Sequence, residues 1–186
     1  NDTRTFEFLV TASGKDKGEL TEDDFILVNE NGEIASAEPR NDKVMSKPSA
    51  ETLLHSAIYK HTDAKAIYHV HTTNITLLSQ LSAPSSELSF SGLEMLKGLG
   101  FQTHDVTVNI PIIENSQDMK YIASIAPGYI DENVPGLILR GHGIYAWGKT
   151  PEEAKRHVEI FEFLFEYRIK ELLKQENFHQ GIHRRY

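Results

Sequence analysis

Three histidines have the types and spacing of a metal site. His69 and His71 belong to an apolar stretch, residues 65–72, that reads as a half-buried strand. Side chains alternate along a strand, so these two imidazoles point the same way and supply half of a site. His142 lies between two glycines that let the backbone approach closely, and it is the candidate third ligand. Three histidines leave coordination positions open, which is typical of a catalytic metal centre. A chance pair on a surface strand is the alternative.

Two carboxylates are candidates for proton transfer, and each also has a structural explanation. Glu51 follows Ser49, the predicted N-cap of a helix that runs to about residue 61, and an acid in the first turn favours the helix dipole. Glu94 follows Ser91 by three residues, which fits a capping box.

A polar turn at residues 13–18 is a candidate anion site. Its serine hydroxyl, lysine and glycine-rich backbone could contact an anion, although a plain connecting loop is the simpler interpretation.

The pattern of apolar residues predicts a mixture of strands and helices along the chain. Asn31-Gly32 indicates a hairpin, and Pro151 suits the first position of the longest helix. The predicted strands are residues 5–12, 25–29, 33–37, 65–72, 87–90, 106–113, 136–140 and 144–147. The predicted helices are a short turn at 20–24 and residues 49–61, 74–81, 115–126 and 151–175.

Composition excludes several classes of protein. The 186 residues are 39% hydrophobic and 25% charged, as expected for one globular domain. A net charge of −8 argues against non-specific nucleic-acid binding. The absence of cysteine excludes disulfides and thiolate ligands and makes the cytoplasm the default compartment. No apolar run approaches the ~20 residues of a membrane span, and no signal-peptide pattern precedes the first strand.

The motifs in this order resemble the class II aldolase/adducin-like family over essentially the whole chain. Residues 48–51, 69–71 and 140–143 carry the resemblance. Five further segments resemble the branch formed by methylthioribulose-1-phosphate dehydratases, namely residues 11–15, 94–98, 110–115, 145–148 and 162–165. The resemblance implies a three-layer α/β/α sandwich around a mixed, mostly antiparallel sheet. It also implies Zn²⁺ on His69, His71 and His142, and a homo-oligomer, often a tetramer, with active sites near subunit interfaces.

The implied activity is zinc-dependent dehydration of 5-methylthioribulose 1-phosphate, a sugar phosphate of methionine salvage. Glu94 occupies the position of the acid/base in the dehydratase branch, and Glu51 occupies that of the aldolase branch. We favour Glu94 and keep Glu51 as second choice. A class II sugar-phosphate aldolase or epimerase is the main alternative. A non-enzymatic adducin-like module is disfavoured because all three histidines and Glu94 are present.

The family usually begins with a helix and a glycine-rich loop that binds the substrate phosphate. Residue 1 of this sequence falls just after that segment, so we expect one domain without it. The resemblance then leaves Ser13, Gly14, Lys15 and Ser49 as the remaining phosphate-binding residues.

Overall fold

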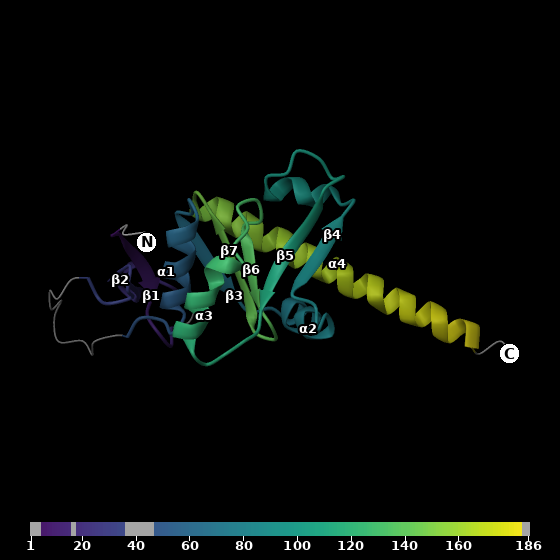
Figure 1. Cartoon of the computed structure of the whole chain (residues 1–186), viewed down its shortest axis with the longest axis horizontal. Helices are drawn as coiled ribbons and strands as arrows, with labels where there is room; N and C mark the ends of the chain where they lie inside the picture. The colour runs from purple at the N-terminus through teal and green to yellow at the C-terminus, as the bar shows by residue number, and fades with distance from the viewer. Residues whose placement is uncertain (1–4, 16–17, 36–46, 184–186) are drawn as a thin grey trace. The chain divides into compact units, whose positions relative to one another are not determined.

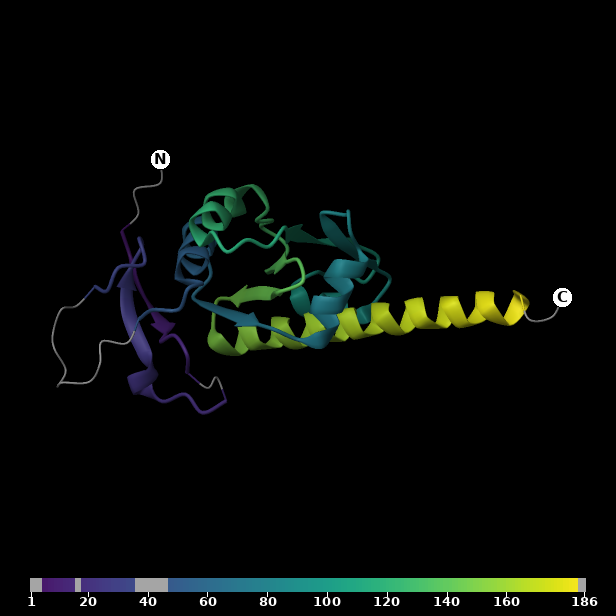
Figure 2. The same cartoon turned by 90° about the horizontal axis from the view of Figure 1, so that it is seen from below.

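The computed structural model describes residues 5–15, 18–35 and 47–183, and it describes side chains up to residue 175 (Figures 1 and 2). The chain forms two compact units. The first unit contains residues 1–62 and 116–127, and the second contains residues 63–115 and 128–186. No helix among the described residues has both the length and the apolar character needed to cross a bilayer.

The first unit contains a two-stranded antiparallel sheet and a pair of packed helices. Phe8 and Val10 of one strand and Val28 of the other are buried and pack with Tyr59 of the first helix. The elements are β1 (Glu7–Thr11), the 3₁₀ turn η1 (Glu22–Asp24), β2 (Phe25–Asn29), α1 (Thr52–His61) and α3 (Met119–Ile125), which continues into the 3₁₀ turn η3 (Ala126–Gly128).

The second unit is built on a five-stranded mixed sheet in the order β3-β7-β6-β5-β4. Only the β5–β6 pair is parallel, and the other three pairs are antiparallel. Every residue of β6 and β7 is buried, as expected for central strands. The elements are β3 (Ala66–Val70), α2 (Thr73–Leu81), β4 (Glu87–Ser91), the 3₁₀ helix η2 (Glu94–Leu99), β5 (Thr107–Ile113), β6 (Gly136–Leu139), β7 (Gly143–Gly148) and α4 (Pro151–His183).

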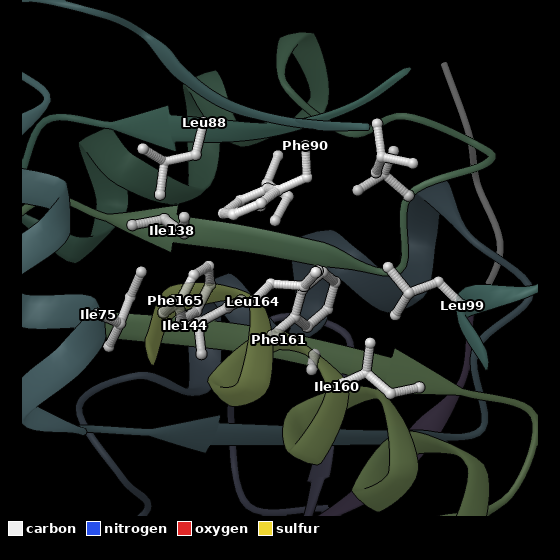
Figure 3. Close-up of a cluster of buried hydrophobic side chains, with 14 of the residues drawn as sticks. Ile75, Leu88, Phe90, Leu99, Ile138, Ile144, Ile160, Phe161, Leu164 and Phe165 are labelled. Carbon is white, nitrogen blue, oxygen red and sulfur yellow. The ribbon is translucent and has the colours of Figure 1, made fainter. Parts of the chain in front are cut away.

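The core of the second unit lies between the sheet and the helices α2 and α4. Phe161 and Phe165, one helical turn apart on α4, stack with ring centroids 6.1 Å apart. They belong to the same buried cluster as Ile138 and Ile144 of the two central strands (Figure 3). Truncating a buried phenylalanine of this kind costs about 3–5 kcal/mol. This packing fixes the strands whose ends carry the candidate site.

The fold class predicted from the sequence, an α/β fold around a mixed and mostly antiparallel sheet, is confirmed. Some element boundaries were wrong. Residues 33–35 do not form a strand and make only a single bridge from Ile34 to Val28, while 36 and 37 lie outside the described residues. The longest helix extends to His183 rather than residue 175 because residues 176–183 keep helical backbone geometry.

Both predicted helix caps were also wrong. The N-cap of α1 is Glu51, and the Ser49 hydroxyl accepts the Glu51 N–H at 3.3 Å in a turn before the helix. Ser91 pairs with Thr107 as the last residue of β4, so it does not cap η2. The N-cap of η2 is Leu93, which leaves the Glu94 side chain available for other contacts.

Candidate metal centre

The three predicted histidines come together at one end of the sheet. Each offers a ring nitrogen, and the three nitrogens all lie within 4.8 Å of one another. The Nε2 atoms of His69 and His71 are 2.8 Å apart, and the His142 ring centroid is 5.0 and 4.6 Å from theirs. The described residues therefore contain one group of three imidazoles that could hold a metal ion.

Strand pairing brings the histidines together. His69 is opposite Tyr145 in the β3–β7 register, and Val70 is opposite Ile144. His71 follows the end of β3, and His142 directly precedes β7, so both reach the same end of this antiparallel pair. Ordinary sheet hydrogen bonds thus bring together side chains that are far apart in the sequence.

Gly143 leaves the space that the imidazoles occupy. A Cβ atom added there would lie 2.4 Å from the Val70 carbonyl oxygen, 2.8 Å from Cδ2 of His71 and 3.1 Å from Cε1 of His69. The first contact is with backbone, which cannot rotate away. The glycine after His142 is therefore required for the three rings to approach one another.

The tautomer of His69 follows from its hydrogen bond. Its Nδ1 is 3.2 Å from the Ile144 carbonyl oxygen, which can only accept, so Nδ1 carries the proton. In the neutral ring Nε2 then has the lone pair, directed toward His71. A carbonyl that orients the far side of a ligating imidazole is usual at metal sites. The ring also stacks on the buried Tyr145 side chain, with centroids 4.1 Å apart.

His142 provides the test of whether a metal fits. Its Nδ1 atom is buried and has no hydrogen-bond partner among the described residues. An unpartnered buried acceptor costs about 1–3 kcal/mol, and a cation held between the three rings would satisfy it. A set of three neutral imidazoles with open positions suits a catalytic divalent ion such as zinc.

Glu94 lies at the opposite end of the same sheet. The His end is the end where β6 finishes, since Leu139 pairs with Gly143. β5 runs parallel to β6 and β4 runs antiparallel to β5, so β4 ends, and η2 begins, at the other end. Figure 1 shows α2, which follows His71, and η2, which begins at Glu94, at opposite ends of the strands. β3 and β4 are also the two edge strands, four spacings or about 19 Å apart.

The Glu94 carboxylate is exposed and contacts two basic side chains, a lysine and a histidine. Lys97 Nζ lies 2.7 Å from Oε2, and His104 Nδ1 lies 3.0 Å from Oε1. The Lys97 ammonium, with a smaller contribution from His104, lowers the pKa of Glu94 below its usual value. Glu94 is therefore ionised at neutral pH, as a proton acceptor must be.

The other predicted site residues belong to the first unit. The loop after β1 and the segment before α1 lie side by side: Ser13 N–H donates to the Lys47 carbonyl, and Ser49 N–H donates to the Thr11 carbonyl. Ser13, Gly14 and Ser49 are thus close in space. Lys15 forms an ion pair with Asp24 at 2.7 Å, so its charge already has a partner.

The comparison with known families identifies the chain. The sequence pattern of the class II aldolase and adducin N-terminal domain matches residues 3–169. The chain belongs to this family. Solved structures share the fold: L-fuculose-1-phosphate aldolase from Thermus thermophilus superposes with a TM-score of 0.60 at 22% identity, covering 97% of this chain and 87% of that one.

Closer relatives within the class II aldolase family are named as dehydratases. The methylthioribulose-1-phosphate dehydratase of Persephonella marina is 46% identical over 160 residues, which are 86% of this chain and 72% of that protein. The enzyme of the same name from Bacillus subtilis is 45% identical over 163 residues, 88% of this chain and 76% of that protein.

Two side chains that bind segments next to the histidines, Arg140 and Glu162, were not predicted as site residues. In the sequence, Arg140 belongs to the motif at residues 140–143, and Glu162 belongs to the segment 162–165. Their contacts join segments that are far apart in the sequence, and no local pattern indicates such contacts.

Proposed function

We propose that the chain, acting as a cytoplasmic homo-oligomer with one Zn²⁺ per subunit, removes water from 5-methylthioribulose 1-phosphate. The product is 2,3-diketo-5-methylthiopentyl 1-phosphate, an intermediate of methionine salvage. The observation that carries the proposal is the cluster of His69, His71 and His142, with a buried unpartnered nitrogen, in a chain 46% identical to a dehydratase of that name.

The chemistry divides between the metal and the side chains. When bound, zinc supplies a Lewis acid that polarises the C2 carbonyl and acidifies the proton on C3. Glu94 accepts that proton and donates a proton to the C4 hydroxyl, which leaves as water. The C3 enol that remains then tautomerises to the 2,3-diketone. The balance is the loss of H from C3 and OH from C4, with no oxidant or reductant.

The position of Glu94 supports an active site shared between copies of the chain. Glu94 and the histidine cluster lie at opposite ends of one sheet, and a carboxylate must come within about 3 Å of the proton that it removes. We therefore propose that Glu94 of one copy reaches the histidines of another copy, in a tetramer or another closed ring. Glu51 remains the second choice for the acid/base.

The phosphate end of the substrate is assigned to the first unit. The proximity of Ser13, Gly14 and Ser49 supports this assignment, because hydroxyl and backbone N–H groups can surround a phosphate. We propose that Lys15 contributes by exchanging Asp24 for the phosphate.

Product analysis tests the function directly. Zinc-loaded protein is incubated with 5-methylthioribulose 1-phosphate, and the products are identified by mass. We expect a product that has lost one water. Cleavage to a three-carbon phosphate and an aldehyde would instead establish an aldolase and move the acid/base role to Glu51. An unchanged substrate would overturn the proposal for this substrate.

A further inference from the structure

Arg140 is a partly buried cation with no role in the proposed reaction. Its side chain is 11% exposed, and Nε lies 2.5 Å from Oε1 of Glu114. Nη1 donates to the Ser79 carbonyl, and Nη2 donates to the Ser85 carbonyl at 2.5 Å. A fourth contact, of 3.4 Å, runs from Nη1 to the Ser82 hydroxyl. The guanidinium thus ties the end of β6 to the last turn of α2 and the loop that follows it.

The turn that carries His142 contacts α2 at two more points. The Gly141 N–H donates to the Ser79 hydroxyl at 2.9 Å, and the Thr76 hydroxyl lies 3.4 Å from the His142 carbonyl oxygen. Gly141 has a φ of +65°, a left-handed conformation that favours glycine. The path of the chain into His142 is therefore set largely by α2.

At its other end, α2 begins directly after His71, which belongs to the half of the cluster at the end of β3. Thr72, the residue after His71, is the N-cap of α2. Glu162 of α4 accepts a hydrogen bond from the Thr72 hydroxyl at 2.6 Å and one from the Asn74 amide at 2.5 Å. α2 and α4 pack together along this contact (Figure 2). The N-terminus of α2 is thus fixed beside His71.

We propose that α2 is a brace that sets the separation between the β3 histidines and His142, and that Arg140 is the positioning residue that attaches His142 to it. The proposal rests on the metal site proposed above. The brace has two charged attachments, Glu162 at the His71 end and Arg140 at the His142 end.

The chemistry of arginine explains why this residue type suits the attachment. Its planar guanidinium carries five N–H donors in a fixed arrangement, so one side chain can hold a carboxylate and two carbonyls at once. The Ser79 carbonyl lies in the C-terminal half of α2, where a cation also interacts favourably with the helix dipole. Metal–ligand distances tolerate errors of about 0.2 Å, so a small displacement of His142 must weaken binding.

The test compares Arg140→Gln with the parent chain in three measurements. Zinc affinity is measured by competition with a chromophoric chelator, the metal geometry by the absorption spectrum of the Co²⁺-loaded protein, and stability by the Tm. The matched control is Arg168→Gln. Arg168 is also a partly buried arginine that donates to a backbone carbonyl, but its partners, Ser89 and Phe90, belong to β4 and not to the segments that carry the histidines. We expect Arg140→Gln to bind zinc about tenfold more weakly or worse and to change the Co²⁺ spectrum. The control should stay within about twofold of the parent chain.

A purely structural role for Arg140 gives a different result. In that case Arg140→Gln lowers the Tm, but the folded protein keeps the zinc affinity and Co²⁺ spectrum of the parent, and the brace is overturned. If Arg140→Gln does not fold, Ser79→Ala removes the acceptor of the Gly141 N–H, together with one hydrogen bond within α2 from the Ser79 hydroxyl to the Thr76 carbonyl. An unchanged zinc affinity in Ser79→Ala then overturns the proposal, and weaker binding supports it. A parent chain that binds no zinc overturns the proposed metal site, and with it the brace.

Discussion

The two ends of the five-stranded sheet are built in different ways. At one end, His69, His71 and His142 are held by strand register, a glycine that leaves space, and a carbonyl that orients one ring. At the other end, Glu94 begins a short 3₁₀ helix, and its carboxylate is 68% exposed. One chain brings the metal ligands together through its own strand pairing, with His71 exposed and the other two rings half-buried, and it presents the acid/base candidate on a surface 3₁₀ helix at the other end.

The difference indicates which part of the reaction each end can support alone. The histidine cluster keeps its geometry without a partner, because strand register, the space at Gly143 and the Ile144 carbonyl set the ring positions within one chain. An exposed carboxylate held by an ion pair is mobile and screened by water, so its contacts are worth little until another surface covers it. The His end should therefore bind metal in a single chain, whereas turnover should need two chains.

The largest expected effect comes from His71→Ala at the histidine end of the sheet. Removing one of three ligands should abolish stoichiometric zinc binding and activity together. Metal content after dialysis and the rate of product formation check this result. His61→Ala is the control, since His61 is an exposed residue of α1 in the first unit. Retention of one zinc per chain in His71→Ala would contradict the three-histidine site.

The next effect is at the Glu94 end of the sheet. Glu94→Gln should keep zinc and lower kcat by about 10²- to 10⁴-fold, because the amide cannot accept the C3 proton. Co-expressed His71→Ala and Glu94→Gln chains should regain activity in about a quarter of the sites, if each site uses residues of two copies. No recovery in the mixture would place the acid/base in the same chain as the histidines. An active Glu94→Gln with an inactive Glu51→Gln would exchange their roles.

A smaller effect is expected from Gly143→Ala, which closes the space among the imidazoles. The new Cβ would meet the Val70 carbonyl at 2.4 Å, so we expect about 10- to 100-fold weaker zinc binding and a loss of about 1–3 kcal/mol in the free energy of unfolding. Zinc competition and urea denaturation measure the two quantities. Gly128→Ala is the control, since a Cβ there meets nothing within 4 Å. Equal zinc affinities in the two variants would show that the cluster is not closely packed.

The smallest effect is a change in pH dependence from Lys97→Met. Lys97 is the main cause of the lowered pKa of Glu94, so its removal should raise that pKa toward its usual value. The ionised form is the proton acceptor, so the acidic limb of the kcat profile should move to higher pH, and only slightly because water screens an exposed pair. The activity above neutral pH should not change. Lys155→Met, which removes a pair with Glu159 on α4, should leave the whole profile unchanged.

Much of the fold could be predicted from the sequence because the relevant signals are local. Short apolar runs located β3 and β6, and Pro151 marked the start of α4. The His-x-His spacing placed two ligands on one face, and the glycines around His142 indicated the third. The cap assignments at Ser49 and Ser91 failed because the same residue types also occur in turns and at strand ends, where backbone pairing decides their role.

Residue types and spacing by themselves determined which side chains can hold a metal and which can transfer a proton. Only the tertiary structure decided where they meet. Sheet order is a long-range property: it brought His142 to His71, and it sent Glu94 to the opposite end although Glu94 is much closer to His71 in the sequence. The attachment of Arg140 to α2 likewise depends on pairing between segments about sixty residues apart, which no local pattern encodes.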